Sequence, residues 1–148
     1  MTAIAATPAA SLARGLDALS SPHARVRAAA IKLLAAFPNE PRVRRALIPA
    51  FEDKAWVVRM QAAEAAAQLG NQADVRRLRR LLTDPHELVR LEAVSSLGFL
   101  RDRGARRRLY ALLHDRSPRR LQSADSAIRG ICNGCETNCH AKRTTRLG

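Results

Sequence analysis

The sequence predicts an all-α fold in which about four helical hairpins stack into a right-handed α-solenoid. Three times, a short polar turn leads into a Val-Arg dipeptide and then into an Ala-rich segment. The Arg of this dipeptide is Arg27, Arg59 and then Arg90, so the copies are 32 and 31 residues apart. A period of about 30 residues with two helical patterns is typical of stacked helical repeats. Aromatic residues make up only 3% of the chain, which also favours closely packed helices over strands.

One face of the second helical segment in each repeat is apolar. Equivalent positions of the three copies carry Val, Ala, Ile, Leu or Phe at spacings that place them on one side of a helix. These side chains are the expected core, because an amphipathic helix buries its apolar face. The five sets are Val26, Val58 and Val89; Ala30, Ala62 and Ala93; Ile31, Ala63 and Val94; Leu34, Ala66 and Leu97; and Phe37, Leu69 and Leu100.

The first helical segment of each repeat follows the same period. Pro49 lies inside one of these segments and predicts a kink, because Pro lacks the N–H that an interior helical position donates. Gly70 is expected to mark a break between repeats. The apolar groups of the first segments are Leu47, Ile48 and Phe51; Leu78, Leu81 and Leu82; and Leu109, Leu112 and Leu113.

The pattern weakens in the fourth repeat, which is expected to cap the solenoid. Asp115 keeps the turn position, but Arg120 and Leu121 replace the Val-Arg pair, and Asp125 stands where an apolar residue is expected. A terminal repeat with one polar face protects the end of a repeat protein from solvent. The sequence therefore predicts a flexible N-terminus (1–11), a repeat domain (12–130) and a basic, Cys-containing tail (131–148).

These repeats resemble HEAT repeats, and in particular the short HEAT-like repeats of phycobilisome lyases and many bacterial proteins. The resemblance implies an α-solenoid, but the family includes scaffolds, chromophore-handling subunits and nucleic-acid binders, so it does not select one function. The third repeat carries the pattern in Leu82, Asp84, Val89, Arg90, Ala93, Val94, Leu97 and Gly98, and the second in Asp53, Val58, Arg59, Ala62, Ala63 and Leu69.

An Asp is followed by an Arg six residues later in two of the repeats. The two pairs are Asp53 with Arg59 and Asp84 with Arg90. The resemblance implies that residues at these positions form a ladder that ties the turn of one repeat to the next. Because an active site is normally single, the repetition favours this structural role over catalysis.

The charge balance favours an acidic partner. The chain carries 26 basic and 13 acidic residues, for a formal net charge of +13. Its arginines cluster on the first helical segments and on the turns between repeats, and stacking aligns those that recur at 31 residues in a column. We therefore expect an acidic protein partner on this Arg-bearing edge. The expected contact residues are Arg45, Arg76, Arg77, Arg80, Arg107 and Arg108.

Nucleic acid is the alternative partner of the same edge, because phosphate contacts without sequence reading need only basic side chains. Single-strand reading by base stacking is not expected, since Tyr110 is the one aromatic residue near the clusters. In this family the second helices line the concave side, and here that side is expected to be nearly neutral. It offers Lys32, Gln61, Glu64, Gln68, Glu92 and Ser95.

The C-terminal segment is where metal chemistry is conceivable from sequence. Cys132, Cys135 and Cys139 lie within eight residues and His140 follows them, so three or four soft ligands are available for zinc or an iron–sulfur cluster. The spacing matches no common zinc or ferredoxin pattern, and free thiols on a flexible tail are the competing interpretation. No other cofactor is expected.

No catalytic motif is found, and the chain is expected to be a non-catalytic binding or scaffolding module. It has no Gly-rich phosphate loop, no Ser-His-Asp arrangement and no paired carboxylates at a unique place. No apolar run is long enough to span a membrane, and no basic leader precedes the Ala-rich start. A cytoplasmic location is therefore expected. His23 and His86 occupy equivalent turn positions and are expected to be exposed, and Trp56 is expected to pack in the core or at its rim.

Overall fold

The computed structural model describes residues 7–102 and Gly104, and within them it contains six α-helices, two short 3-10 helices and no strand. The all-α prediction is confirmed. Helices pair into three hairpins, in which the first helix of the second and third hairpins is divided between an α-helix and a 3-10 helix. The elements are α1 (Pro8–Ala18), α2 (Ala24–Leu34), α3 (Pro41–Leu47), η1 (Pro49–Glu52), α4 (Trp56–Gln68), η2 (Gln72–Asp74), α5 (Val75–Leu81) and α6 (Glu87–Phe99).

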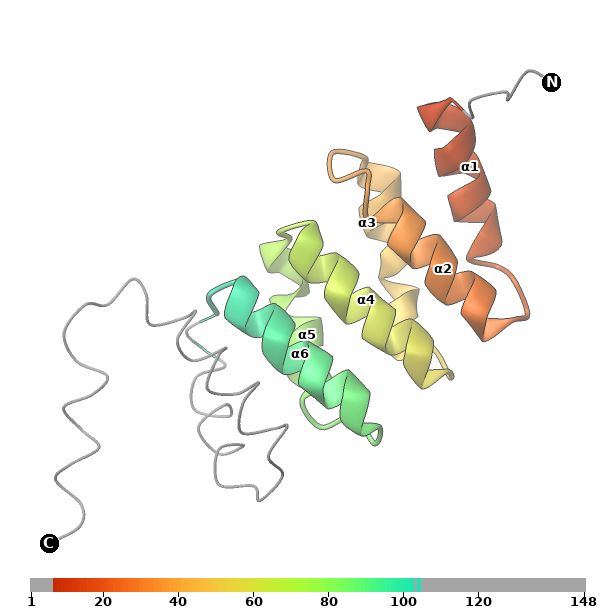
Figure 1. The fold of residues 1–148 in the computed structure, drawn as a ribbon. Coiled ribbons are helices and arrows are strands. Elements are labelled where there is room, and N and C mark those ends of the chain that lie inside the picture. The colour runs from red at the N-terminus through yellow and green to blue at the C-terminus, as the bar shows by residue number, and fades with distance from the viewer. Residues whose placement is uncertain (1–6, 103, 105–148) are drawn as a thin grey trace, which may run out of the picture.

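The second helices of the hairpins form one layer. Figure 1 shows α2, α4 and α6 side by side, with α3 and α5 behind them and α1 against α2. Alanines fill the contacts within this layer, and Ala62, Ala63 and Ala93 have no exposed surface. Small side chains allow neighbouring helix axes to approach closely, which explains why the second helices are Ala-rich.

The expected core positions are buried with few exceptions. Ile31, Leu34 and Leu97 are fully buried, but Val26 is 42% exposed. The equivalent residues Val58 and Val89 of the later repeats are buried, whereas the described residues place no earlier repeat beside α2. Ile48 is also exposed, because α3 ends at Leu47 and the 3-10 turn that starts at Pro49 rotates Ile48 away from the core. The predicted kink at Pro49 is this junction.

The ends of α4 and α6 share one capping geometry. Gly70 has a φ of +62°, and the N–H groups of Gly70 and Asn71 donate to the carbonyls of Ala67 and Ala66. This is a Schellman motif, which favours Gly because an L side chain strains the left-handed conformation. Arg101 takes the equivalent position after α6 with a φ of 54°, so the same turn forms there without Gly.

The first described helix begins close to the predicted start of the repeat domain. Helix α1 starts at Pro8, four residues before residue 12. The hydroxyl of Thr7 accepts a hydrogen bond from the N–H of Ala10, and Pro8 occupies the first turn, where its missing N–H costs nothing. Gly15 then allows α1 to approach α2, since a Cβ at that position would lie 2.8 Å from Leu34 Cδ2.

The buried face of α6 gives a direct test of this packing. Replacing Leu97, which is fully buried, with Ala should destabilise the fold by roughly 2–5 kcal/mol, because it leaves a cavity in the core. Ser95 is exposed on the opposite side of the helix, so Ser95→Ala should leave stability nearly unchanged. The measurement is the urea midpoint of each variant, and equal shifts would contradict the orientation of α6.

Candidate functional site

A ladder of arginine–aspartate pairs links successive hairpins. Arg27 of α2 donates from Nε and Nη2 to the two carboxylate oxygens of Asp53, both at 2.8 Å. Arg59 of α4 repeats this fork toward Asp84, at 2.7 and 2.9 Å. Each fork runs from a second helix to the turn that precedes the next one, so it fixes the position of one repeat against its neighbour.

The same arginines also hold the turn of their own repeat. Nη1 of Arg59 donates to the backbone carbonyl of Asp53 at 2.7 Å, and Nη1 of Arg90 donates to that of Asp84 at 2.6 Å. The carboxylates in turn start the helices, because Asp53 accepts from the N–H of Ala55 and Asp84 from that of His86. Arg27 and Arg59 therefore each contact two turns, and Asp53 and Asp84 each link the preceding second helix to the start of the next one.

The ion pairs of the ladder are not the pairs of residues that recur six positions apart in the sequence. Asp53 and Arg59, six residues apart, meet only through the Asp53 carbonyl, whereas the ion pairs join residues 25 or 26 positions apart. Arg27 was missed, although it is the repeat equivalent of Arg59. The Val-Arg dipeptide could have identified it, because the Asp of the next turn follows each of these arginines by 25 or 26 residues. Arg90 by this offset reaches Asp115, which lies outside the described residues.

Pairing keeps the ladder carboxylates ionised. The Arg27 hydrogen bonds hold the pKa of Asp53 below its ordinary value in spite of partial burial. Burial alone would raise the pKa of Asp84, but hydrogen bonds from Arg59 and from the His86 N–H, with the charge of Arg59, outweigh it and lower that pKa. A carboxylate with a lowered pKa is a poor proton acceptor, and the arginine hydrogen bonds that lower it are those that join one repeat to the next.

Some of the remaining arginines of the described chain form ion pairs, and others are exposed without an acidic partner among the described residues. Arg77 pairs with buried Asp74 at 2.8 Å, and Arg79 pairs with Asp102 at 2.6 Å. Arg45 of α3 and Arg76 of α5 are exposed at equivalent positions and have no acidic partner among the described residues. Arg80 is also exposed, and its nearest acid is Glu52 at 3.7 Å. Of the expected contact residues, Arg107 and Arg108 lie outside the described residues.

Arg45, Arg76 and Arg80 will be called the first-helix arginines. They come from α3 and α5, which lie behind the layer of second helices in Figure 1. Glu52 and Arg80 have side chains about 80% and 78% exposed, so water screens their contact and it adds little to stability. The structure thus presents a basic surface on the first helices.

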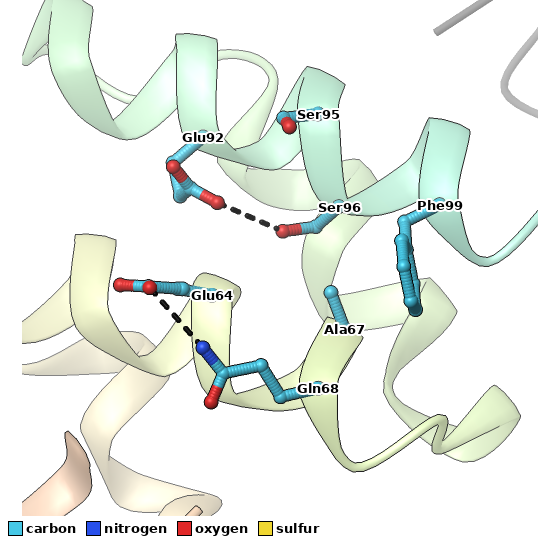
Figure 2. Close-up of a pocket in the computed structure, with 7 residues that line it drawn as sticks. All are labelled: Glu64, Ala67, Gln68, Glu92, Ser95, Ser96 and Phe99. Atoms are coloured by element: carbon cyan, nitrogen blue, oxygen red, sulfur yellow. Dashed lines mark hydrogen bonds between the residues drawn. The ribbon is translucent and has the colours of Figure 1, made fainter. Parts of the chain in front are cut away.

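In contrast to the basic first helices, the second helices carry an acidic pocket between α4 and α6. Glu64 of α4 and Glu92 of α6 face the same gap, and Figure 2 shows it closed at one end by Phe99. The gap is a shallow pocket of about 110 Å³. The expectation of a nearly neutral surface therefore misses a local concentration of negative charge, because residues 28 positions apart meet only when the repeats stack. Its lining residues are Glu64, Ala67, Gln68, Glu92, Ser95, Ser96 and Phe99.

Burial and charge act together on Glu92. Burial first, and the negative charge of Glu64 second, raise the pKa of Glu92 above its ordinary value. Ser96 offsets this only weakly, because its hydroxyl donates to the carbonyl of Ala63 at 2.9 Å and lies 3.4 Å from Glu92 Oε1. Glu64 is better supplied, since the amides of Gln61 and Gln68 donate to it. The ionised form of Glu92 is therefore short of hydrogen-bond donors.

An aromatic stack covers the turn before α6. The rings of Trp56 and His86 are parallel, with centroids 3.9 Å apart, and His86 Nδ1 is buried without a hydrogen-bond partner among the described residues. His86 is thus half-buried rather than an exposed turn residue, whereas His23 is exposed as expected. Trp56 is 38% exposed, so it packs at the rim of the core.

The expected metal ligands Cys132, Cys135, Cys139 and His140 lie outside the described residues. Within residues 7–102 and Gly104, no three His, Cys, Asp or Glu side chains are grouped closely enough to hold a metal ion. Over the same part of the chain, no helix combines the length and the apolar character that crossing a membrane requires.

Comparison with known proteins identifies the repeat type. The sequence pattern of HEAT repeats matches residues 12–97. The structure of the complex of CpcE and CpcF of phycocyanin lyase from Nostoc sp. PCC7120 superposes with a TM-score of 0.72 at 26% identity, over 82% of this chain and 53% of that chain. None of the curated proteins matches.

A second solved structure agrees on the fold. An engineered protein from the Northeast Structural Genomics Consortium superposes with a TM-score of 0.63 at 21% identity, over 83% of this chain and 63% of that chain. The present chain spans less than two thirds of the length of either structure. HEAT repeats commonly serve as protein-interaction scaffolds, so the fold is that of a binding module.

The ladder can be tested by removing one charge. Asp84→Asn should destabilise the fold by about 3 kcal/mol or more, because it leaves the largely buried Arg59 guanidinium without its counter-charge. Glu52→Gln removes the same charge from an exposed pair and should leave the urea midpoint nearly unchanged.

Acid titration supplies a second readout of the same variant. Because the pKa values of Asp53 and Asp84 are lowered on folding, their contribution is complete above the unfolded-state pKa of about 4 and is lost as the pH falls through the folded-state values. Stability should fall less steeply with acid in Asp84→Asn than in the natural chain. An identical acid profile would contradict the ladder assignment.

Glu92 should show the opposite sign. Since its pKa is raised on folding, the cost of ionising it is absent below the unfolded-state pKa of about 4 and appears as the pH rises through the folded-state value. Glu92→Gln should therefore raise the thermal midpoint at neutral pH and leave it unchanged in acid. A lower midpoint at neutral pH would show that Glu92 is stabilised by contacts other than those described.

Proposed function

The chain belongs to the HEAT repeat family, and we propose that it is a non-catalytic adaptor that binds an acidic protein partner through the first-helix arginines, Arg45, Arg76 and Arg80. One observation carries the proposal. The ladder arginines Arg27 and Arg59 form ion pairs with aspartates. Arg45 and Arg76, by contrast, are exposed at equivalent positions without an acidic neighbour among the described residues. Such a surplus attracts acidic surfaces.

The geometry of these positions suits a protein surface. Arg45 and Arg76 project from successive first helices, and the guanidinium group donates in a planar fork that matches a carboxylate. Neighbouring helices in such a layer lie about 8–10 Å apart, so two carboxylates on one partner surface can be contacted together. Two exposed charge pairs add little affinity singly, but they raise the association rate and select an acidic partner.

A solved relative also functions in an assembly. The structure of CpcE and CpcF is that of a complex, which supports a role for the fold in binding another protein chain. The proposal does not extend to the lyase activity named for that complex, because no residue of the described chain is assigned to chromophore chemistry.

The proposal is tested by affinity capture of cytoplasmic proteins with matched baits. An acidic protein should be retained by the natural chain and by Arg14→Gln/Arg25→Gln/Lys32→Gln, and lost with Arg45→Gln/Arg76→Gln/Arg80→Gln. The two triple variants change the net charge equally, but the control residues are exposed on α1 and α2. Quantitative mass spectrometry of the captured proteins is the readout.

Nuclease treatment separates the two classes of partner. Retention of the acidic protein should survive nuclease, whereas a partner held through nucleic acid would disappear. Binding of a DNA duplex whose affinity falls with salt at a slope of about 0.9 per phosphate contact, and is weakened by the first-helix variant, would replace the protein partner with nucleic acid. Equal capture by both triple variants would overturn the proposed surface.

A further inference from the structure

The outward stripe of α6 is apolar at both ends and acidic at its centre. Leu88 is 40% exposed and Phe99 is 72% exposed, the largest value among the exposed large hydrophobic side chains of the described residues. Glu92 lies between them on the same side of the helix, since residues four and seven apart share a face. The neighbouring stripe of α4 contributes Glu64 and Gln68 to the same pocket.

The exposure at the position of Phe99 is a property of the repeat and not of the last described helix. The equivalents of Phe99 in the two earlier hairpins are Gln68 and Ala36, and both remain exposed although each of those hairpins has a successor packed beside it. A following repeat therefore covers a different side of the second helix. Phe99 thus stays on the outer surface, where large apolar side chains mark sites of contact with another molecule. Leu88 is 40% exposed in the described chain, although its equivalent Val57 packs partly against the core.

We propose that the groove between α4 and α6 binds a basic amphipathic segment of a partner protein, which inserts a Lys or Arg side chain between Glu64 and Glu92 and packs apolar residues against Leu88 and Phe99. This surface is separate from the first-helix arginines and accepts the opposite charge. Its partner is thus distinct from the acidic protein proposed above, or is a distinct part of it.

The size of the pocket selects a side chain over a free ligand. Its volume of about 110 Å³ is well below the 300–1,000 Å³ of usual small-molecule sites. It accommodates one ammonium or guanidinium group, and Phe99 at its edge provides an aromatic face for that cation (Figure 2). The remaining affinity has to come from contacts outside the pocket, which the exposed ends of the α6 stripe supply.

Electrostatics favours a cation at this position despite the overall positive charge of the chain. Charges farther away than the Debye length of about 8 Å are largely screened at physiological salt, so the two nearby carboxylates dominate. Burial raises the pKa of Glu92, and Glu64 raises it further. A bound cation would remove both the mutual repulsion of the carboxylates and the shortage of donors around Glu92.

The length of the segment follows from the stripe. Leu88 to Phe99 spans 11 residues of α-helix, or about 16 Å at 1.5 Å per residue. A partner helix of about 12–14 residues lying along the groove can therefore contact both ends. Lys32 on the adjacent second helix α2 is exposed and carries positive charge, which confines a basic segment to the α4–α6 side.

The test uses two fluorescein-labelled peptides of about 14 residues and the full-length chain. One peptide is an amphipathic helix of Leu and Lys, and the other has Glu in place of every Lys. Both peptides are measured with Arg45→Gln/Arg76→Gln/Arg80→Gln, which removes the proposed site for acidic partners. Fluorescence anisotropy at physiological salt should show that the Lys peptide binds this variant at least about tenfold more tightly than the Glu peptide. Equal affinities, or no binding of the Lys peptide, would overturn the proposal.

Variants locate the binding. Glu64→Gln/Glu92→Gln should weaken the Lys peptide about tenfold, corresponding to about 1.4 kcal/mol, and Phe99→Ala should weaken it about two- to fivefold. The control Asp17→Asn/Glu52→Gln removes the same charge from exposed positions on α1 and η1 and should leave the affinity unchanged.

The outcome is independent of the proposed adaptor surface. Arg45→Gln/Arg76→Gln/Arg80→Gln should bind the Lys peptide as the natural chain does, so either surface can fail without the other. Circular dichroism confirms that each variant is folded. Unchanged affinity in the glutamate variant or in Phe99→Ala, or an equal loss in the Asp17→Asn/Glu52→Gln control, would overturn the assignment of the groove.

Discussion

The repeat architecture depends on the fork between each second-helix arginine and the aspartate of the next turn. Arg59 shows why, because one guanidinium holds the carbonyls of its own turn through Nη1 and the carboxylate of Asp84 through Nε and Nη2. Asp84 in turn accepts from the N–H of His86 and starts α6. Helix start, turn and inter-repeat spacing are thus set by one hydrogen-bonded unit, and a partly buried charge is tolerated because every described donor of it has an acceptor.

The arginines of the described chain have two roles, as structural ion pairs and as exposed charges. Arginines that follow Val in a second helix lie beside the next turn and are neutralised by aspartate, as Arg27 and Arg59 are. The first helices carry both kinds, since Arg77 and Arg79 pair with aspartates, whereas Arg45 and Arg76 are exposed and free to contact solvent or a partner. The ladder arginines contribute to the formal net charge of +13 but are already neutralised by aspartates. The exposed arginines of the first helices carry the charge that can attract an acidic partner.

The sequence was sufficient for the helices, their order and most of the core, because helical periodicity is local and the three copies reinforce one another. It was insufficient for features that stacking creates. The pairing of Arg27 with Asp53, the meeting of Glu64 and Glu92, and the stack of Trp56 on His86 all join residues of different repeats. Val26 shows the converse, since a core pattern shared with later repeats is exposed where the described residues place no neighbour.

Two surfaces of opposite charge on opposite layers have a consequence for how such a module can assemble. The acidic partner and the basic segment proposed above would not compete for space, because the first-helix arginines lie on α3 and α5, behind the second-helix layer that holds the α4–α6 groove. The two partners carry opposite charges, but at physiological salt these charges attract each other only over about a Debye length. Binding at one site should therefore leave the affinity of the other nearly unchanged. An adaptor needs this property, since it brings two chains together without either one excluding the other.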